Sequence, residues 1–267
     1  MKIDRRKFFG SLGTTAAIGA MSHSARAEAL EHFMIEQLDA ADGGSSDDDG
    51  DANAKMLDFY DPERKVPRGA GRLFAENKNL TPMPKAPTLV DFFELRFAPA
   101  RHVLQSAQRA LDTNQPERTV LACLLHDTVL NLVKPDHGWW GAQLYEPYVD
   151  ERVSWGIRYH QALRFFPDPE LGYEYPDFYN RIFGEDYEPD EYIQSAHKFA
   201  RDHKWYMEAR LITMNDEYSF NDEAKVSIEP FIDIIGRHFK TPKEGLGNDN
   251  SASSHMWRSI ANPNRPL

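Results

Sequence analysis

The feature that most constrains this chain is a nearly continuous apolar run at residues 121–133, LACLLHDTVLNLV, with a histidine and an aspartate in its middle. Its apolar residues fall on two stripes at helical spacing, and a helix that is apolar on both sides is buried. His126 and Asp127 are therefore expected in or near the core. An ionised carboxylate among leucines is costly unless a positive side chain or a metal ion compensates it. The run thus predicts a buried polar site.

Apolar residues recur at helical spacing along most of the chain beyond residue 90. The segments with this spacing are 91–113, 116–133, 138–148, 150–165, 190–214 and 225–240. Proline and glycine residues separate them, and no segment shows the strict alternation that is typical of a half-buried strand. The pattern predicts an all-α fold, with a single helical domain over residues 91–240.

Both ends of the chain lack this periodicity and are predicted to form irregular arms. Residues 28–90 begin with a short amphipathic stretch and continue through an acidic low-complexity linker at 42–54. A linker of this composition is too polar to bury a core. The tail 241–267 is predicted to be mostly loop with one short helix.

The first 27 residues are typical of an export signal. They have a basic start, a modestly apolar middle that is too short to span a bilayer stably, and an Ala-Arg-Ala end. The stretch DRRKFF resembles the twin-arginine signal, with Arg5 and Arg6 as the pair and Asp4 where a serine or threonine is usual. This resemblance implies export of the folded protein through the twin-arginine (Tat) machinery. It also implies a periplasmic location and no stable membrane insertion once the signal is removed.

Charge and cysteine content exclude further classes. Removal of residues 1–27 would take away five basic residues and one acidic residue, which moves the net charge from −11 to −15. So acidic a chain is a poor ligand for nucleic acid or anionic membranes, and no nucleic-acid partner is expected. The single cysteine, Cys123, excludes an internal disulfide and is expected to be a buried, inert thiol.

Other titratable residues border the apolar faces of the predicted helices. Helical spacing places His160 and Asp216 on or beside inward faces. The candidate site residues are His102, His126, Asp127, His137, His160 and Asp216. Four imidazoles and two carboxylates suit two first-row transition ions, iron, manganese or zinc, better than calcium or magnesium. Asp127 has two oxygens and a central place in the set, so it could bridge both ions.

The ordered combination of these motifs resembles the HD-domain superfamily. The matching stretches are RHVLQSAQRAL, LACLLHD, HGWWGAQLYEPYVDERVSWGIRYHQALRFF and EARLITMNDE, within residues 92–220. The closer resemblance is to the mixed-valent di-iron oxygenases of that superfamily, which include inositol oxygenase and the phosphonate-cleaving HD oxygenases. Ordinary HD hydrolases share the H…HD…D order, and two-metal HD phosphodiesterases also share the two intervening histidines.

The resemblance implies a role for each residue. The first iron would be held by the residues His102, His126, Asp127 and Asp216. The second would be held by Asp127, His137 and His160, with open positions for a small organic substrate and O2. In the family a ferrous/ferric pair uses O2 to oxidise a substrate C–H bond, so Asp127 is also the predicted catalytic residue.

This chain departs from the family after the HD pair. Relatives often carry Gly and a histidine or lysine there, whereas this chain has Val129 and Leu130. A phosphonate or inositol substrate is therefore not expected. Arg164 falls where relatives carry a basic substrate-binding residue, and it is predicted to bind substrate or, equally, to form a structural salt bridge.

Two alternatives to an oxygenase remain open from the sequence: a metal-dependent phosphohydrolase acting on a phosphoester, and a non-catalytic metal-binding protein. Few basic residues lie near the motif, which counts against a phosphate site. Trp139 and Trp140 are predicted to pack in the core, with a pocket wall as the alternative. His197 and His203 are predicted to lie at the surface. Lys204 and Arg210 are predicted to be solvated or paired at the surface, with a position that reaches the site as the alternative.

Overall fold

The computed structural model describes residues 80–263 apart from 98–99, 131, 134–135, 177–179, 181–183, 185, 217–220 and 222–223. The predicted export signal, the acidic linker and most of the N-terminal arm lie outside the described residues. The described part is all-helical, as predicted, and contains no strand; Asp168 and Tyr173 form an isolated β-bridge. No helix in this part is long and apolar enough to cross a membrane.

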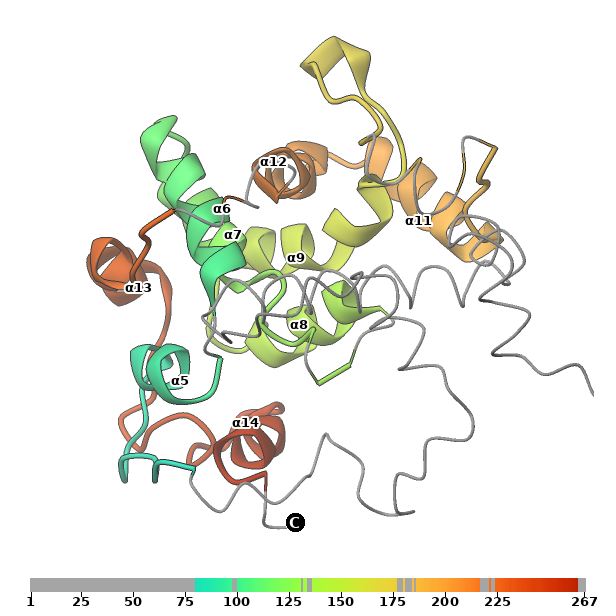
Figure 1. The fold of residues 1–267 in the computed structure, drawn as a ribbon. Coiled ribbons are helices and arrows are strands. Elements are labelled where there is room, and N and C mark those ends of the chain that lie inside the picture. The colour runs from blue at the N-terminus through green and yellow to red at the C-terminus, as the bar shows by residue number, and fades with distance from the viewer. Residues whose placement is uncertain are drawn as a thin grey trace, which may run out of the picture.

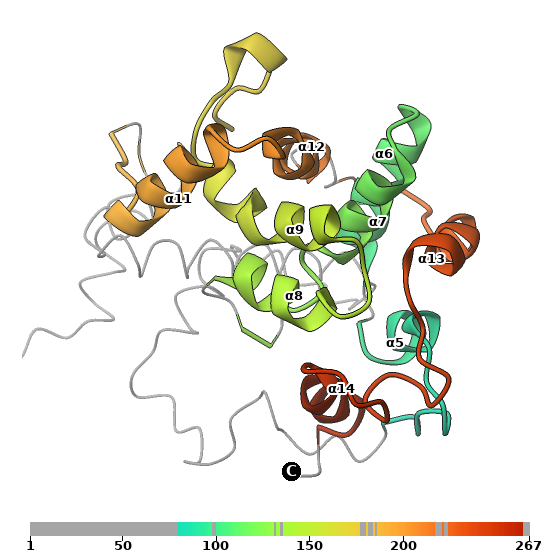
Figure 2. The same ribbon diagram turned by 180° about the vertical axis from the view of Figure 1, so that it is seen from behind.

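The helices form a bundle around a central helix, α9 (Figures 1 and 2). In chain order the elements are α5 (Leu89–Leu95), α6 (Arg101–Asp112), α7 (Glu117–Leu125), α8 (His137–Tyr145), α9 (Glu151–Leu163), η2 (Pro169–Leu171), α11 (Glu191–Arg201), α12 (Tyr206–Asp216), η3 (Glu229–Phe231), α13 (Ile232–His238) and α14 (Ser254–Ala261). Helix α9 packs against α12, α8, α7 and α11, while α6 packs on α7 and α12. Every helix that carries a candidate metal ligand therefore belongs to one packed group.

The segment 91–113, predicted as one helical segment, is two helices. Helix α5 begins with a capping box, in which the Thr88 hydroxyl accepts from the Asp91 amide and the Asp91 carboxylate accepts from the Thr88 amide. It ends at Leu95, and the Arg96 guanidinium donates to the carbonyl of Ala261 at 2.8 Å. The next helix, α6, begins at Arg101.

The segment 190–214 also divides into two helices, α11 and α12. Helix α11 ends at Arg201, and the imidazole Nδ1 of His203 accepts a hydrogen bond from the Trp205 amide at 3.1 Å. A side chain that bonds its own neighbouring backbone competes with the helical hydrogen bond. The chain turns here, and α12 then runs to Asp216.

The apolar run at residues 121–133 is helical only as far as Leu125. Beyond it the backbone bonds shorten to three residues, from Thr128 to Leu125 and from Leu130 to Asp127. The Thr128 hydroxyl also donates to the Leu125 carbonyl at 2.9 Å. The predicted helix 116–133 is therefore too long, and the HD pair lies at the end of α7, where the backbone turns.

The C-terminal tail contributes to the core and does not form a detached arm. Its one helix, α14, carries Trp257, which is fully buried and packs edge-on against Phe92 of α5 at 4.7 Å between ring centroids. The same indole contacts Tyr145 of α8 at 5.7 Å. Burying such an aromatic surface contributes on the order of 1.5–3 kcal/mol. The core thus extends beyond the range 91–240 predicted for the helical domain.

Candidate metal centre

Six buried histidines and aspartates meet at the inner face of the bundle. Helix α6 carries His102, the end of α7 carries His126 and Asp127, α8 begins with His137, α9 carries His160, and α12 ends with Asp216. They form two groups that share one member. The first is His102, His126, Asp127 and Asp216, and the second is Asp127, His137 and His160. Within each group one donor atom per residue lies within 4.8 Å of every other.

The first group surrounds a small space lined by nitrogen and oxygen atoms. Nε2 of His102 lies 2.6 Å from Oδ1 of Asp216 and 3.5 Å from Oδ2 of Asp127. Nε2 of His126 lies 3.4 Å from Oδ2 of Asp127 and 3.6 Å from Oδ1 of Asp216. Ligands about 2.1 Å from a metal ion and at right angles to each other lie about 3 Å apart. The spacing of these atoms therefore suits one transition ion.

The second group uses the other oxygen of the same carboxylate. Oδ1 of Asp127 lies 3.1 Å from Nε2 of His137 and 3.2 Å from Nε2 of His160. The two imidazole nitrogens are 3.2 Å apart. Asp127 thus directs Oδ2 to the first group and Oδ1 to the second, which is the arrangement of a bridging carboxylate.

Backbone carbonyls set the tautomer of two of the histidines. Nδ1 of His126 donates to the Cys123 carbonyl at 2.7 Å, and Nδ1 of His160 donates to the Ile157 carbonyl at 2.6 Å. Because a carbonyl only accepts, each Nδ1 carries a proton, and in the neutral ring the Nε2 lone pair faces the group. Metal-binding histidines are commonly oriented by such a bond from the nitrogen that does not bind the metal.

The buried carboxylates Asp127 and Asp216 favour a cation in the site. Burial alone would raise the pKa of Asp127, but His126 and His137 hold it well below its usual range. Burial works against a charged His126, yet the neighbouring Asp127 raises the pKa of this imidazole to about 10. The buried atoms His126 Nε2, Asp127 Oδ2 and Asp216 Oδ1 have no partner in hydrogen-bond geometry. A metal ion would satisfy all three atoms at once, so the residues present fit a two-metal centre.

The pKa of His160 is shifted in the opposite direction from that of His126. Burial lowers the pKa of His160 to about 4. This imidazole is therefore neutral at ordinary pH, which is the form in which histidine binds metals.

Arg164, one turn after His160, lies beside the first group. Its guanidinium Nη2 donates to Oδ2 of Asp216 at 2.6 Å, and the side chain is 2% exposed. Burial alone would raise the pKa of Asp216, but Arg164 holds it well below its usual range. Of the two roles predicted for Arg164, the structure contains the salt bridge.

Arg210 is buried, which corrects the predicted surface position. Its guanidinium donates to the carbonyls of Leu163 and Phe166 at 3.1 and 3.0 Å and to the Tyr206 hydroxyl at 2.9 Å. The Leu163 carbonyl ends α9 and also accepts from the Phe166 amide at 3.1 Å, while the Phe166 carbonyl lies just beyond the helix. Arg210 therefore caps the helix that carries His160. Lys204 lies at the surface, as predicted, with its ammonium 4.8 Å from the Trp205 ring centroid.

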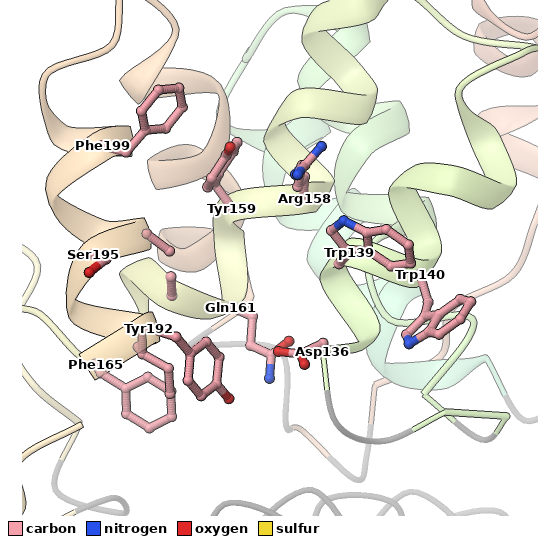
Figure 3. Close-up of a pocket in the computed structure, with 13 residues that line it drawn as sticks. Asp136, Trp139, Trp140, Arg158, Tyr159, Gln161, Phe165, Tyr192, Ser195 and Phe199 are labelled. Carbon is pink, nitrogen blue, oxygen red and sulfur yellow. The ribbon is translucent and has the colours of Figure 1, made fainter. Parts of the chain in front are cut away.

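Trp139 and Trp140 do not pack in the core; each is 39% exposed. They form one wall of a groove of about 640 Å³ between α8, α9 and α11. Figure 3 shows Tyr159 and Gln161 of α9 between these tryptophans and the α11 side chains Tyr192 and Phe199. The groove lining also includes Asp136 and Gln161, neighbours in sequence of His137 and His160. Its size suits a small organic molecule.

The spacing of two aromatic residues in α11 is a sequence signal for this groove. On helix α11, Tyr192 and Phe199 are seven residues apart, and both line the groove. Such spacing places two residues on one helix face. His197 and His203, predicted at the surface, are partly buried, with His197 stacked on Phe166 at 3.8 Å between ring centroids.

Cys123 is the buried thiol that the sequence predicts. It is fully buried, and burial raises its pKa to about 12. A thiol held so far from ionisation is a weak nucleophile.

Comparison with known proteins gives no family assignment. No family model matches the chain, and no curated protein shows significant sequence similarity to it.

Proposed function

We propose that this protein is an exported di-iron oxygenase that uses O2 to oxidise a C–H bond of a small organic substrate. The observation that carries the proposal is the pair of buried ligand groups joined through the two oxygens of Asp127. The resemblance of the motifs to mixed-valent HD-domain oxygenases, including the order of all six residues, supports iron and O2 as the cofactor and co-substrate. Two iron ions would supply the redox chemistry, and manganese or zinc ions are the alternative metals.

The chain's own residues would hold and shield the metals. His102, His126, Asp127 and Asp216 would hold one ion, and Asp127, His137 and His160 the other. All six side chains are buried, and Leu121, Leu125 and Val129 pack in the surrounding core. A buried apolar surround excludes water and strengthens the electrostatic interactions inside it. The three-residue group offers fewer protein ligands, so substrate or O2 would complete its coordination.

The aromatic groove is the proposed place of substrate recognition. It begins one residue from His137 and His160, at Asp136 and Gln161 (Figure 3). Its walls are aromatic and its polar side chains, Arg158 and Asp136 among them, carry both signs of charge. This lining favours a substrate with an apolar or ring-shaped part over a highly charged phosphoester.

The second candidate function is hydrolysis of a phosphoester, because two-metal HD phosphodiesterases share the same ligand order. The groove and the buried site gather few cations, and Arg164 is engaged by Asp216. Phosphate sites usually gather lysine and arginine. The charges near the site thus favour the oxygenase.

Location and partners form the rest of the proposal. The twin-arginine motif supports export to the periplasm as a folded, metal-loaded protein, and the acidic composition argues against nucleic acid as a partner.

The experiment that tests the function is metal analysis with electron paramagnetic resonance. The protein is purified without oxygen and then exposed to a limited amount of it. Two irons per chain and a mixed-valent signal after partial oxidation are expected. Zinc, manganese or magnesium without that signal would contradict the oxygenase and favour hydrolysis, which a screen of phosphoesters would then test.

A further inference from the structure

Arg164 is a buried cation whose guanidinium reaches a candidate metal ligand. It follows the last residue of α9 and is 2% exposed. Its Nη2 donates to Oδ2 of Asp216, 52 residues further along the chain, at 2.6 Å. A short charge-assisted bond between buried groups fixes the orientation of both.

The two oxygens of Asp216 therefore face different groups. Oδ2 accepts from Arg164, while Oδ1 lies 2.6 Å from Nε2 of His102 and 3.6 Å from Nε2 of His126. With Oδ2 held, Oδ1 stays directed at the space between the two imidazoles. A carboxylate without this partner could rotate or offer both oxygens to the ion.

We propose that Arg164 is a positioning residue that orients Asp216 as a one-oxygen ligand of the first metal ion. The inference rests on the proposed metal centre. It differs from the substrate-binding role that the resemblance implies, since the buried guanidinium donates to Asp216 and does not line the aromatic groove.

The backbone of Arg164 is itself held from outside the site. The Tyr173 hydroxyl donates to the Arg164 carbonyl at 2.9 Å, and Arg210 donates to the carbonyls on either side, those of Leu163 and Phe166. The Arg210 guanidinium also stacks on the Tyr173 ring, 4.6 Å from its centroid. This framework fixes the helix end from which the Arg164 side chain extends toward Asp216.

The guanidinium also sets the charge of the first group. Asp127 and Asp216 bring two negative charges, and Arg164 places one positive charge against the outer oxygen of Asp216. Partners of this kind orient the ligand and tune the metal site, and their loss commonly weakens metal binding. Arg164 is thus expected to affect the first ion more than the second.

The test compares Arg164→Gln and Arg164→Lys with Arg152→Gln, a matched control at an exposed position of the same helix and outside the groove. The wild-type chain and each variant are loaded with cobalt(II), folding is checked by circular dichroism, and metal stoichiometry, affinity and visible spectrum are measured. For Arg164→Gln we expect affinity for one of the two ions to fall about 10- to 100-fold, with a changed spectrum for that ion. Arg164→Lys keeps the positive charge but lacks the planar guanidinium, so its metal affinity should lie between those of the wild type and Arg164→Gln.

The outcomes separate this inference from the proposed function. If the wild-type chain binds no metal, the proposed centre itself fails. If the wild-type chain binds two ions and both Arg164 variants bind them with wild-type affinity and spectrum, the positioning role is overturned. In that case, a change confined to substrate affinity would assign Arg164 to the substrate instead. Should Arg164→Gln not fold, the spectrum of Arg164→Lys decides: a shift in one of the two ions supports the role, and an unchanged spectrum refutes it.

Discussion

At the scale of single residues, Asp127 has the most demanding position in the molecule. It is the one residue common to both ligand groups, and each of its oxygens faces two imidazole nitrogens at 3.1 to 3.5 Å. Among the described residues, no other side chain belongs to both ligand groups. Loss of this one carboxylate should therefore affect both metal sites.

We predict that Asp127→Ala loses both metal ions and all activity, whereas His102→Ala weakens only the first ion. Metal content per chain, measured after gel filtration, checks this prediction. His238→Ala is the control, because His238 pairs with Glu117 away from the site. Two ions retained by Asp127→Ala would refute the bridging assignment.

A second buried carboxylate, Asp168, supports the site from a distance. Arg201 and Tyr206 donate to its Oδ2, and Nε of Arg210 lies 4.0 Å from the same atom. Burial alone would raise the pKa of Asp168, but Tyr206 and Arg201 lower it. Asp168 therefore orders the arginine that caps α9.

We predict that Asp168→Asn lowers the free energy of unfolding of the metal-free protein by about 1–3 kcal/mol at neutral pH. Because the folded-state pKa is depressed, this contribution is present above the usual aspartate range and is lost as the pH falls through the folded-state value. The difference between wild type and variant should therefore shrink in strong acid. Denaturant unfolding at several pH values measures it, and a difference that grows on acidification would contradict the assignment.

At the scale of helices, the close contact between α8 and α9 joins the two histidines of the second group. Gly138, one residue after His137, makes this approach possible. A Cβ atom built on it would lie 2.8 Å from the Ile157 carbonyl and 3.2 Å from Cε1 of His160. Since the carbonyl belongs to a helix backbone, a side chain at this position would force the helices apart.

We predict that Gly138→Ala destabilises the fold by about 1–3 kcal/mol and weakens the second metal ion. The matched control is Gly236→Ala in α13, where a Cβ atom would meet nothing within 4 Å. That substitution should be neutral or stabilise by about 0.4–1 kcal/mol. Chemical denaturation and metal content of both variants test the pair; equal behaviour would refute the packing argument.

At the scale of the whole molecule, the two proposed ions would cross-link the bundle. Their ligands come from α6, α7, α8, α9 and α12, or from residues directly adjoining them. An ion that binds the folded state and not the unfolded chain stabilises the fold through its binding free energy.

We predict that removal of the metals with a chelator lowers the thermal midpoint of unfolding and that restoring the native ion reverses the loss. A free ion concentration 100 times its dissociation constant corresponds to about 2.7 kcal/mol of stabilisation. Calorimetry with and without chelator measures the shift. An unchanged midpoint at saturating metal would show that no ion is held by the native fold.

The proposed export can also be tested on the whole chain. Replacement of Arg5 and Arg6 with lysine should retain the protein in the cytoplasm, because the twin-arginine machinery recognises the pair. Cell fractionation with a specific antibody provides the measurement. Normal delivery of this variant to the periplasm would refute the twin-arginine interpretation.

The sequence by itself determined the helical class and the residues worth examining. Apolar spacing near 3.6 predicts helices because side chains three and four apart share a face, and a His-Asp pair in an apolar run stands out because burying charge is costly. These are local properties, readable without the fold. The buried state of Cys123 followed from the same run.

Only the tertiary structure decided where the helices end and what the side chains meet. At the end of α5 the Arg96 guanidinium bonds to the carbonyl of Ala261, which lies 165 residues further along the chain. The exposure of Trp139 and the burial of Arg210 depend on which neighbouring helix covers each face. Arg164 shows the limit most clearly, because its spacing from His160 predicted a position but its partner, Asp216, comes from another helix. Periodicity orients a side chain on its own helix, whereas packing between helices determines the atoms that it contacts.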